Sequence, residues 1–258
     1  MLSLKDKIVC ITGASAGIGL ACAREFAKHG SALLLCARRI DRVAALANEL
    51  RKQGVRVHAF KLDVRDRNEV EKSFATLPAE WKEIDILINN AGLSRGLDKL
   101  QDGAVQDWDE MIDTNIKGLL YVTRCVLPRM VERKQGHVIN LGSIAGHQVY
   151  PAGNVYCATK FAVNALSHAI RMDVHGTGVR VCSVEPGLVQ TEFSEVRFHG
   201  DTGRAAKVYA DTHPLKPVDV AEVIVFCAMR PPHVDISEVI VMPTDQASVF
   251  HVHRTPQT

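Results

Sequence analysis

The sequence lacks several features that would place it in a special class of protein. No apolar run approaches the roughly 18 residues that a membrane-spanning helix needs. The opening residues, 1–7, are too polar for the hydrophobic core of a signal peptide. The 31 Lys and Arg residues nearly balance the 29 Asp and Glu residues, and a net charge of +2 argues against a nucleic-acid binder. We therefore expect a cytoplasmic protein with neither a membrane nor a nucleic acid as partner.

Paired cysteines are also absent. The chain has seven cysteines, none in a Cys-x-x-Cys pair, and most of them lie inside apolar runs. This pattern favours buried, reduced thiols over a disulfide framework, and it predicts no metal site. The 258 residues contain no repeat, linker or low-complexity stretch, so we expect a single domain spanning residues 1–258.

Short apolar runs alternate with longer amphipathic stretches along the chain. The runs are nearly continuous in apolar residues, which is typical of a parallel sheet covered on both faces. This alternation predicts an α/β fold, a single doubly wound domain of the Rossmann type. The predicted strands are residues 8–12, 32–36, 55–62, 84–89, 138–141 and 179–184, and the first two predicted helices are residues 20–28 and 41–52.

The alternation stops after the sixth predicted strand. Residues 186–217 read as a long irregular segment. A segment of this kind after a late strand of a doubly wound sheet commonly covers a substrate. We therefore expect residues 188–216, approximately, to form a short substrate-covering segment.

A glycine-rich turn follows the first predicted strand. Gly13, Gly17 and Gly19 have the spacing Gly-x-x-x-Gly-x-Gly, which differs from the commoner Gly-x-Gly-x-x-Gly fingerprint. Glycines here let the backbone approach a pyrophosphate, and the start of the following helix favours negative charge. The alternative is a tight turn that binds nothing.

The end of the second predicted strand distinguishes between two nicotinamide cofactors. A carboxylate at this place would bind the ribose hydroxyls of NAD and repel a 2′-phosphate. The chain instead has Arg38 and Arg39, whose charge and forked shape suit a phosphate, so we predict NADP. The alternative is a solvated pair of surface arginines. Asp63 and Val64, after the third predicted strand, are expected to meet the adenine.

Three further residues suggest acid–base chemistry on an oxygen atom. Tyr156 and Lys160 are four residues apart and share one face of a predicted helix. A nearby cation lowers the pKa of a tyrosine and makes it a usable base. Ser143 follows the fifth predicted strand, at the edge where open α/β sheets bind ligands, and its hydroxyl can donate to a carbonyl.

Taken together, these motifs resemble the short-chain dehydrogenase/reductase family over essentially the whole chain. Each motif alone is weak, but their order and spacing are those of the family. The matching segments are Thr12-Gly13-x-x-x-Gly17-x-Gly19, Asn89-Asn90-Ala91-Gly92, Asn115, Ser143, Tyr156-x-x-x-Lys160 and Pro186-Gly187.

The resemblance implies a role for each matching residue. Tyr156 exchanges a proton with the substrate oxygen, Lys160 lowers its pKa, and Ser143 polarises the carbonyl. Asn115 helps to hold a water molecule in a proton relay. The cofactor-binding residues that it implies, together with those argued above, are Gly13, Ser15, Gly17, Ile18, Gly19, Arg38, Arg39, Asp63, Val64, Asn90, Ala91, Gly92, Tyr156, Lys160, Pro186, Gly187, Val189 and Thr191.

Longer stretches resemble one branch of the family. Residues 185–198, 152–156 and 252–254 look like the serine 3-dehydrogenase or 3-hydroxy acid dehydrogenase type. This resemblance implies an NADP-dependent homotetramer that oxidises serine, allo-threonine or 3-hydroxypropionate, or reduces malonic semialdehyde. The alternatives are a general carbonyl reductase, a 3-oxoacyl reductase and, more remotely, a non-catalytic NADPH-sensing protein.

A small hydroxy acid needs a cation for its carboxylate. Arg197, in the segment after Pro186, is the candidate, and Arg95 is a second one. The alternative for Arg197 is a surface position or a subunit contact.

Overall fold

The computed structural model describes residues 2–255. Within that range, seven parallel strands form one sheet in the order β3-β2-β1-β4-β5-β6-β7. The strands are β1 (Ile8–Thr12), β2 (Ala32–Ala37), β3 (Val57–Lys61), β4 (Ile86–Asn89), β5 (Gly136–Leu141), β6 (Val179–Pro186) and β7 (Glu238–Val241). The doubly wound α/β prediction is therefore confirmed.

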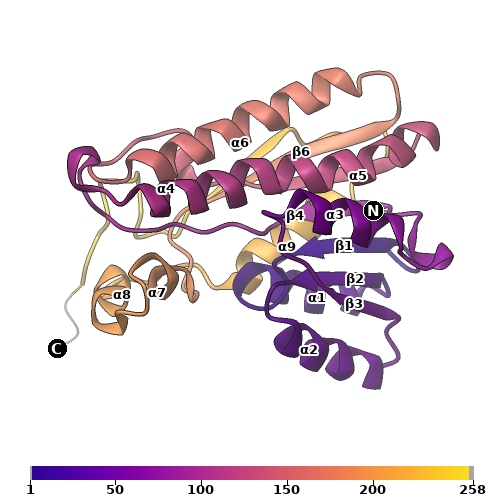
Figure 1. Cartoon of the computed structure of the whole chain (residues 1–258), viewed down its shortest axis with the longest axis horizontal. Helices are drawn as coiled ribbons and strands as arrows, with labels where there is room; N and C mark the ends of the chain where they lie inside the picture. The colour runs from indigo at the N-terminus through magenta and orange to yellow at the C-terminus, as the bar shows by residue number, and fades with distance from the viewer. Residues whose placement is uncertain (1, 256–258) are drawn as a thin grey trace.

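Helices cover both faces of this sheet, as Figure 1 shows. One hydrophobic cluster joins the sheet to α1, α2 and α9, and another joins its opposite face to α3, α5 and α6. Every residue of β1, β2 and β6 is buried, because both of their faces are covered. The helices are α1 (Gly17–Lys28), α2 (Ile40–Lys52), α3 (Arg67–Ala75), α4 (Val105–Ile112), α5 (Leu119–Glu132), α6 (Asn154–Asp173), α7 (Phe193–Arg197), α8 (Thr202–Tyr209) and α9 (Pro217–Ala228).

The structure differs from the sequence prediction in two places. β7 was not predicted, because four residues at a partly exposed sheet edge give no long apolar run. The segment after Pro186 is not irregular throughout, since it contains α7 and α8. Asp201 caps α8 by accepting a hydrogen bond from the Arg204 amide at 2.9 Å, which is a local signal for a helix start.

The strand order places a topological switch point between β1 and β4. The chain leaves β1 toward one edge of the sheet and returns through β4 toward the other, so the loops after these strands diverge and leave a crevice. In Figure 1, α7 and α8 lie together at one end of the molecule. No helix within residues 2–255 has the length and hydropathy to cross a membrane.

Candidate active site

A cleft of about 780 Å³ runs across the switch point. It is lined by the turn after β1, the loops after β2 to β6, and residues of α6 and α7. Every cofactor, catalytic and substrate residue predicted from the sequence lines this cleft except Gly19 and Asn115. Residues that are far apart in the chain thus meet at one site.

The glycine turn has a distinct requirement at each position. Gly13 and Gly17 have φ values of +67° and +54°, which strain any other residue. Gly19 has no such backbone; a Cβ there would collide with the Asn90 side chain and the Gly13 carbonyl. Ala16 precedes α1 without a capping side chain, so the first amides of the helix have no side-chain acceptor from that residue. Gly19 therefore serves packing, while the turn before it faces the cleft.

Arg39 connects the glycine turn with the start of α7. Its guanidinium donates to the Ser15 hydroxyl at 3.2 Å and to the Glu192 carboxylate at 2.8 Å. Arg42, on the first turn of α2, donates to the other oxygen of Glu192 at 2.6 Å. Arg42 was missed by the sequence reasoning, although it lies only three residues after Arg39. An anionic group therefore already bridges two arginines beside the cleft.

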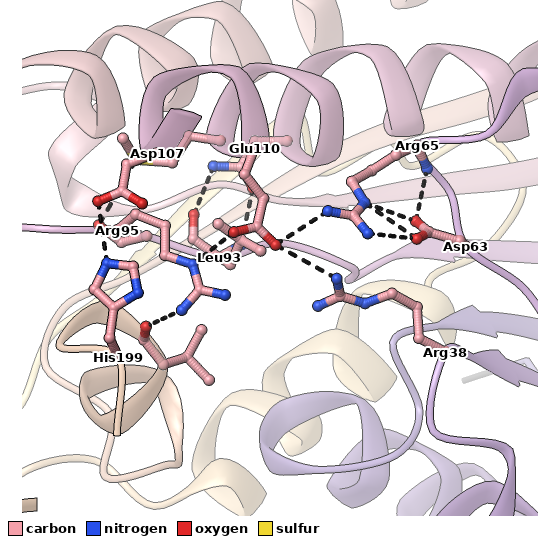
Figure 2. A network of polar contacts seen from close by, with 12 residues as sticks. Arg38, Asp63, Arg65, Leu93, Arg95, Asp107, Glu110 and His199 are labelled. Atoms are coloured by element: carbon pink, nitrogen blue, oxygen red, sulfur yellow. Dashed lines mark hydrogen bonds and ion pairs between the residues drawn. The ribbon is translucent and has the colours of Figure 1, made fainter. Parts of the chain in front are cut away.

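A second cluster of arginines surrounds Glu110 of α4 (Figure 2). Arg38 and Arg65 lie 3.5 Å and 3.1 Å from the same carboxylate oxygen. Arg95 donates to the other oxygen at 2.7 Å. Arg65 also holds Asp63, the predicted adenine neighbour, at 2.6 Å. Glu110 thus ties the loops after β2, β3 and β4 to one helix.

The Arg95 guanidinium also reaches α7. It donates to the backbone carbonyl of Val196, and the Gly96 amide donates to the Arg197 carbonyl at 2.9 Å. On the same side, His199 lies 3.1 Å from the Asp107 carboxylate of α4, as Figure 2 shows. These contacts fix the segment after Pro186 against α4 and the loop after β4.

We expect Glu110→Gln to lower stability at neutral pH and to have little effect in acid. Partial burial acts to raise the pKa of Glu110, but the Arg95 hydrogen bond and the neighbouring arginine charges hold it below the usual 4.5. The contribution of this carboxylate to the free energy of unfolding is therefore complete above pH 4.5 and is lost as the pH falls through the lowered pKa. After allowance for solvent screening we expect about 1 kcal/mol, or about 2–4 °C in Tm.

Thermal unfolding of both proteins at pH 7 and near pH 3 measures this difference. If the difference in Tm between the two proteins were the same at both pH values, the charge of Glu110 would not contribute to stability.

Tyr156 lines the cleft and is buried. Burial raises the pKa of its phenol, and the nearby Arg197 charge and the Ser143 hydroxyl oppose this effect. The Arg197 guanidinium carbon lies 5.1 Å from the centre of the Tyr156 ring. Its charge thus favours the phenolate form of this tyrosine.

Lys160 is buried on the same helix, and its ammonium group donates to the Leu141 carbonyl at 2.8 Å. Burial lowers the pKa of Lys160 to about 8, although the Glu185 charge opposes this. Its nitrogen lies 6.0 Å from the centre of the Tyr156 ring. The sequence predicts that Lys160 lowers the pKa of Tyr156, and Arg197 is a second cation beside the ring whose charge acts in the same direction.

Asn115 does not line the cleft but lies in a π-helical turn, η3 (Asp113–Gly118), which continues α4 into α5. Its amide accepts from the Leu93 amide at 2.9 Å and donates to the Leu93 carbonyl at 2.8 Å. It also donates to the Thr159 hydroxyl at 3.0 Å. Asn115 therefore joins the loop after β4 to the helix that carries Tyr156 and Lys160.

Arg197 points into the cleft from the end of α7. It donates to the Tyr150 hydroxyl at 2.8 Å and to the Ser94 hydroxyl at 3.0 Å, both of which are neutral groups. Arg95 is instead paired with Glu110. Tyr150 and Ser94 could not be identified from the sequence, because no motif marks them as neighbours of an arginine more than 40 residues away.

Comparison with known proteins finds relatives that match most of the chain. A family model described as short chain dehydrogenase matches residues 7–201. The NADP-dependent 3-hydroxy acid dehydrogenase YdfG of Escherichia coli K12 is 49% identical over 249 residues, covering 96% of this chain and 99% of that protein. The sulfoacetaldehyde reductase 2 of Chromohalobacter salexigens is 47% identical, covering 96% of this chain and 98% of that protein.

A solved structure also matches closely. It is described as the closed form of serine dehydrogenase complexed with NADP⁺, with a TM-score of 0.91 and 48% identity, covering 96% of this chain and 100% of that chain. The family model covers residues 7–201, and the two relatives and this structure each cover 96% of the chain. The chain belongs to the short chain dehydrogenase family.

Proposed function

We propose that the protein is an NADP-dependent oxidoreductase that interconverts the 3-hydroxyl and the 3-oxo group of small 3-hydroxy acids. The observation that carries this proposal is the Arg197 guanidinium, which lies over the Tyr156 ring and bonds only to neutral hydroxyls among the described side chains. A carboxylate held there places the rest of a small molecule against the tyrosine. The names of the 3-hydroxy acid dehydrogenase and serine dehydrogenase relatives support the same conclusion.

The residues that line the cleft are suited to binding NADP. The turn at Gly13 and Gly17 exposes backbone where a pyrophosphate can approach. Arg38, Arg39 and Arg42 form a positive group beside it, and we assign the 2′-phosphate of NADP to these side chains. When bound, the nicotinamide supplies or accepts the hydride.

The remaining chemistry belongs to the protein. Tyr156 takes a proton from the substrate hydroxyl during oxidation and returns it during reduction. Ser143 orients the reacting oxygen toward the phenol. Lys160 keeps a positive charge near the phenolate, and Arg197 supplies a second one. Residues 188–216, including α7 and α8, exclude water over the substrate.

Arg197 binds any compact anion, so the anionic group need not be a carboxylate. The sulfoacetaldehyde reductase relative has a name that specifies a sulfonate. A sulfonated aldehyde is therefore the second substrate class, and it uses the same arginine and the same tyrosine.

The direct test is absorbance of the reduced nicotinamide with purified protein. NADP⁺ and NAD⁺ are each supplied with L-serine, L-allo-threonine, 3-hydroxypropionate and propan-2-ol. We expect NADP⁺-dependent turnover of the hydroxy acids. Turnover of propan-2-ol alone would support a general carbonyl reductase instead, and NADPH binding without any turnover would support a sensing protein.

Replacing Arg38 and Arg39 together by alanine should weaken NADP⁺ selectively. Each lost ionic hydrogen bond to the phosphate is worth about 1.5–3 kcal/mol, so we expect KM for NADP⁺ to rise at least about 100-fold. KM for NAD⁺, which has no 2′-phosphate, should change by less than about threefold. Arg24→Ala is the matched control, because Arg24 pairs with Glu49 on the outer surface. An equal effect on both cofactors would rule out phosphate recognition by these arginines.

We also propose that residues 1–258 form one domain that assembles as a homotetramer in the cytoplasm, with no nucleic-acid partner. Both hydrophobic clusters pack on the same sheet, and Leu120 of α5 and Phe161 of α6 remain exposed in the single chain. All seven cysteines are free thiols, and six of them are buried, which suits a reducing compartment. Light scattering that shows a monomer at micromolar concentration would overturn the tetramer.

A further inference from the structure

Glu185 is a completely buried carboxylate behind the catalytic residues. It lies on β6, one residue before Pro186, with an exposed fraction of 0%. The Ser143 amide donates to one of its oxygens at 2.5 Å, and the Ser183 hydroxyl donates to the other. Burying a carboxylate costs free energy unless it is hydrogen-bonded or paired with a positive charge. Glu185 meets the first condition through the two serines.

The loop that carries Ser143 is shaped around this carboxylate. A side chain at Gly142 would collide with both oxygens of Glu185. A Cβ at Gly146 would lie 2.8 Å from the backbone carbonyl of Lys160 and 3.5 Å from a Glu185 oxygen. The two glycines therefore let the loop close over Glu185 and against the helix that carries Lys160.

The charge of Glu185 acts on Lys160. Burial lowers the pKa of Lys160, and the Glu185 carboxylate is the group that raises it again. Burial also raises the pKa of Glu185, and the Ser183 and Ser143 hydrogen bonds and the Lys160 charge oppose that rise. Each of the two buried groups therefore favours the charged form of the other.

Other titratable groups reach Glu185 from the neighbouring elements. His147, after the Ser143 loop, lies 3.9 Å from Glu185 and 3.1 Å from Glu238 of β7. His168 of α6 lies 3.3 Å from Glu238, and its side chain is 54% exposed. These are the titratable side chains that lie between the buried carboxylate and the surface.

We propose that Glu185 is a positioning residue for the dehydrogenase reaction. Its carboxylate fixes the backbone of Ser143 from behind and places a negative charge next to the loop that packs against the Lys160 backbone. Glu185 touches neither substrate nor cofactor in this role, and it acts through those two residues. The inference rests on the proposed function, because it concerns the same reaction.

Glu185→Gln tests this role, because it keeps the shape of the side chain and removes its charge. We expect kcat for NADP⁺-dependent oxidation to fall about 10- to 100-fold, with NADPH affinity changed less than about threefold. The fall of kcat at high pH, which is the alkaline limb of its pH profile, should begin about one pH unit lower. The reason is that Lys160 loses its proton more easily without the Glu185 charge. Glu25→Gln is the matched control: Glu25 is also buried, but it pairs with Lys28 on α1, away from the cleft.

Two outcomes overturn the role of Glu185. One is a folded Glu185→Gln protein with the kcat and pH profile of an active wild type. The other is complete absence of wild-type turnover, which overturns the proposed function as well.

Ser183→Ala is the second test variant, for use if Glu185→Gln does not fold. This substitution removes only one hydroxyl donor to the Glu185 carboxylate. It should lower kcat about threefold or more, because the carboxylate then holds the Ser143 backbone less firmly, without a change in NADPH affinity. An unchanged kcat in this variant would overturn the proposal.

Discussion

Tyr156→Phe should bind NADPH as the wild type does and lose nearly all turnover. The substitution removes one oxygen and leaves the ring that packs against Phe193 at a centroid distance of 5.6 Å. General acid–base catalysis contributes about 100- to 10,000-fold, so we expect kcat to fall within that range. Nucleotide fluorescence measures the affinity, and single-turnover absorbance measures the residual hydride transfer.

Tyr150→Phe is the matched control for this prediction. Tyr150 also lines the cleft, but its hydroxyl accepts a hydrogen bond from Arg197. Its loss should lower kcat less than about tenfold, because the variant removes one of the two hydroxyl acceptors of Arg197 and no proton-transfer group. Equal losses in the two variants, or retained activity in Tyr156→Phe, would contradict the assignment of the proton to Tyr156.

Arg197→Met should lower activity on anionic substrates far more than activity on neutral ones. A lost charge-assisted hydrogen bond of about 1.5–3 kcal/mol corresponds to about a 10- to 100-fold rise in KM for 3-hydroxypropionate. Because Arg197 also lowers the pKa of Tyr156, the ascending limb of the oxidation pH profile should move to higher pH. Initial rates across the pH range report both effects.

Arg204→Met provides the control for Arg197→Met. Arg204 belongs to α8 in the same segment, and its guanidinium carbon lies 4.4 Å from the centre of the Phe198 ring, outside the cleft. It should leave the KM for both kinds of substrate within about twofold. If Arg197→Met lowered activity on charged and uncharged substrates equally, Arg197 would have no role in recognising the anion.

The local parts of the fold could be predicted from the sequence. Continuous apolar runs identify β1, β2 and β6, since strands covered on both faces have no polar side. The glycine turn is recognisable because its left-handed positions exclude other residues. Tyr156 and Lys160 share a helix face by spacing alone.

Contacts between distant segments could not be predicted in this way. Arg197 meets Ser94 across 103 residues, and Glu185 meets Ser143 across 42 residues. A glutamate at the end of a strand and a glutamate on an amphipathic helix look equally ordinary in sequence. Only the fold shows that Glu185 is enclosed and that Glu110 gathers three arginines. The strand β7 was missed for a related reason, because its place at the edge needs no apolar run.

The central claim is that a cation beside a catalytic tyrosine selects a small anionic alcohol. The most direct measurement compares kcat/KM for 3-hydroxypropionate and 3-hydroxypropionamide with NADP⁺ and the wild-type protein. The two molecules have nearly the same shape and differ by one negative charge. We predict that the acid is preferred by about 100-fold, as expected for an ionic contact with Arg197. Equal values, or a preference for the amide, would contradict the account.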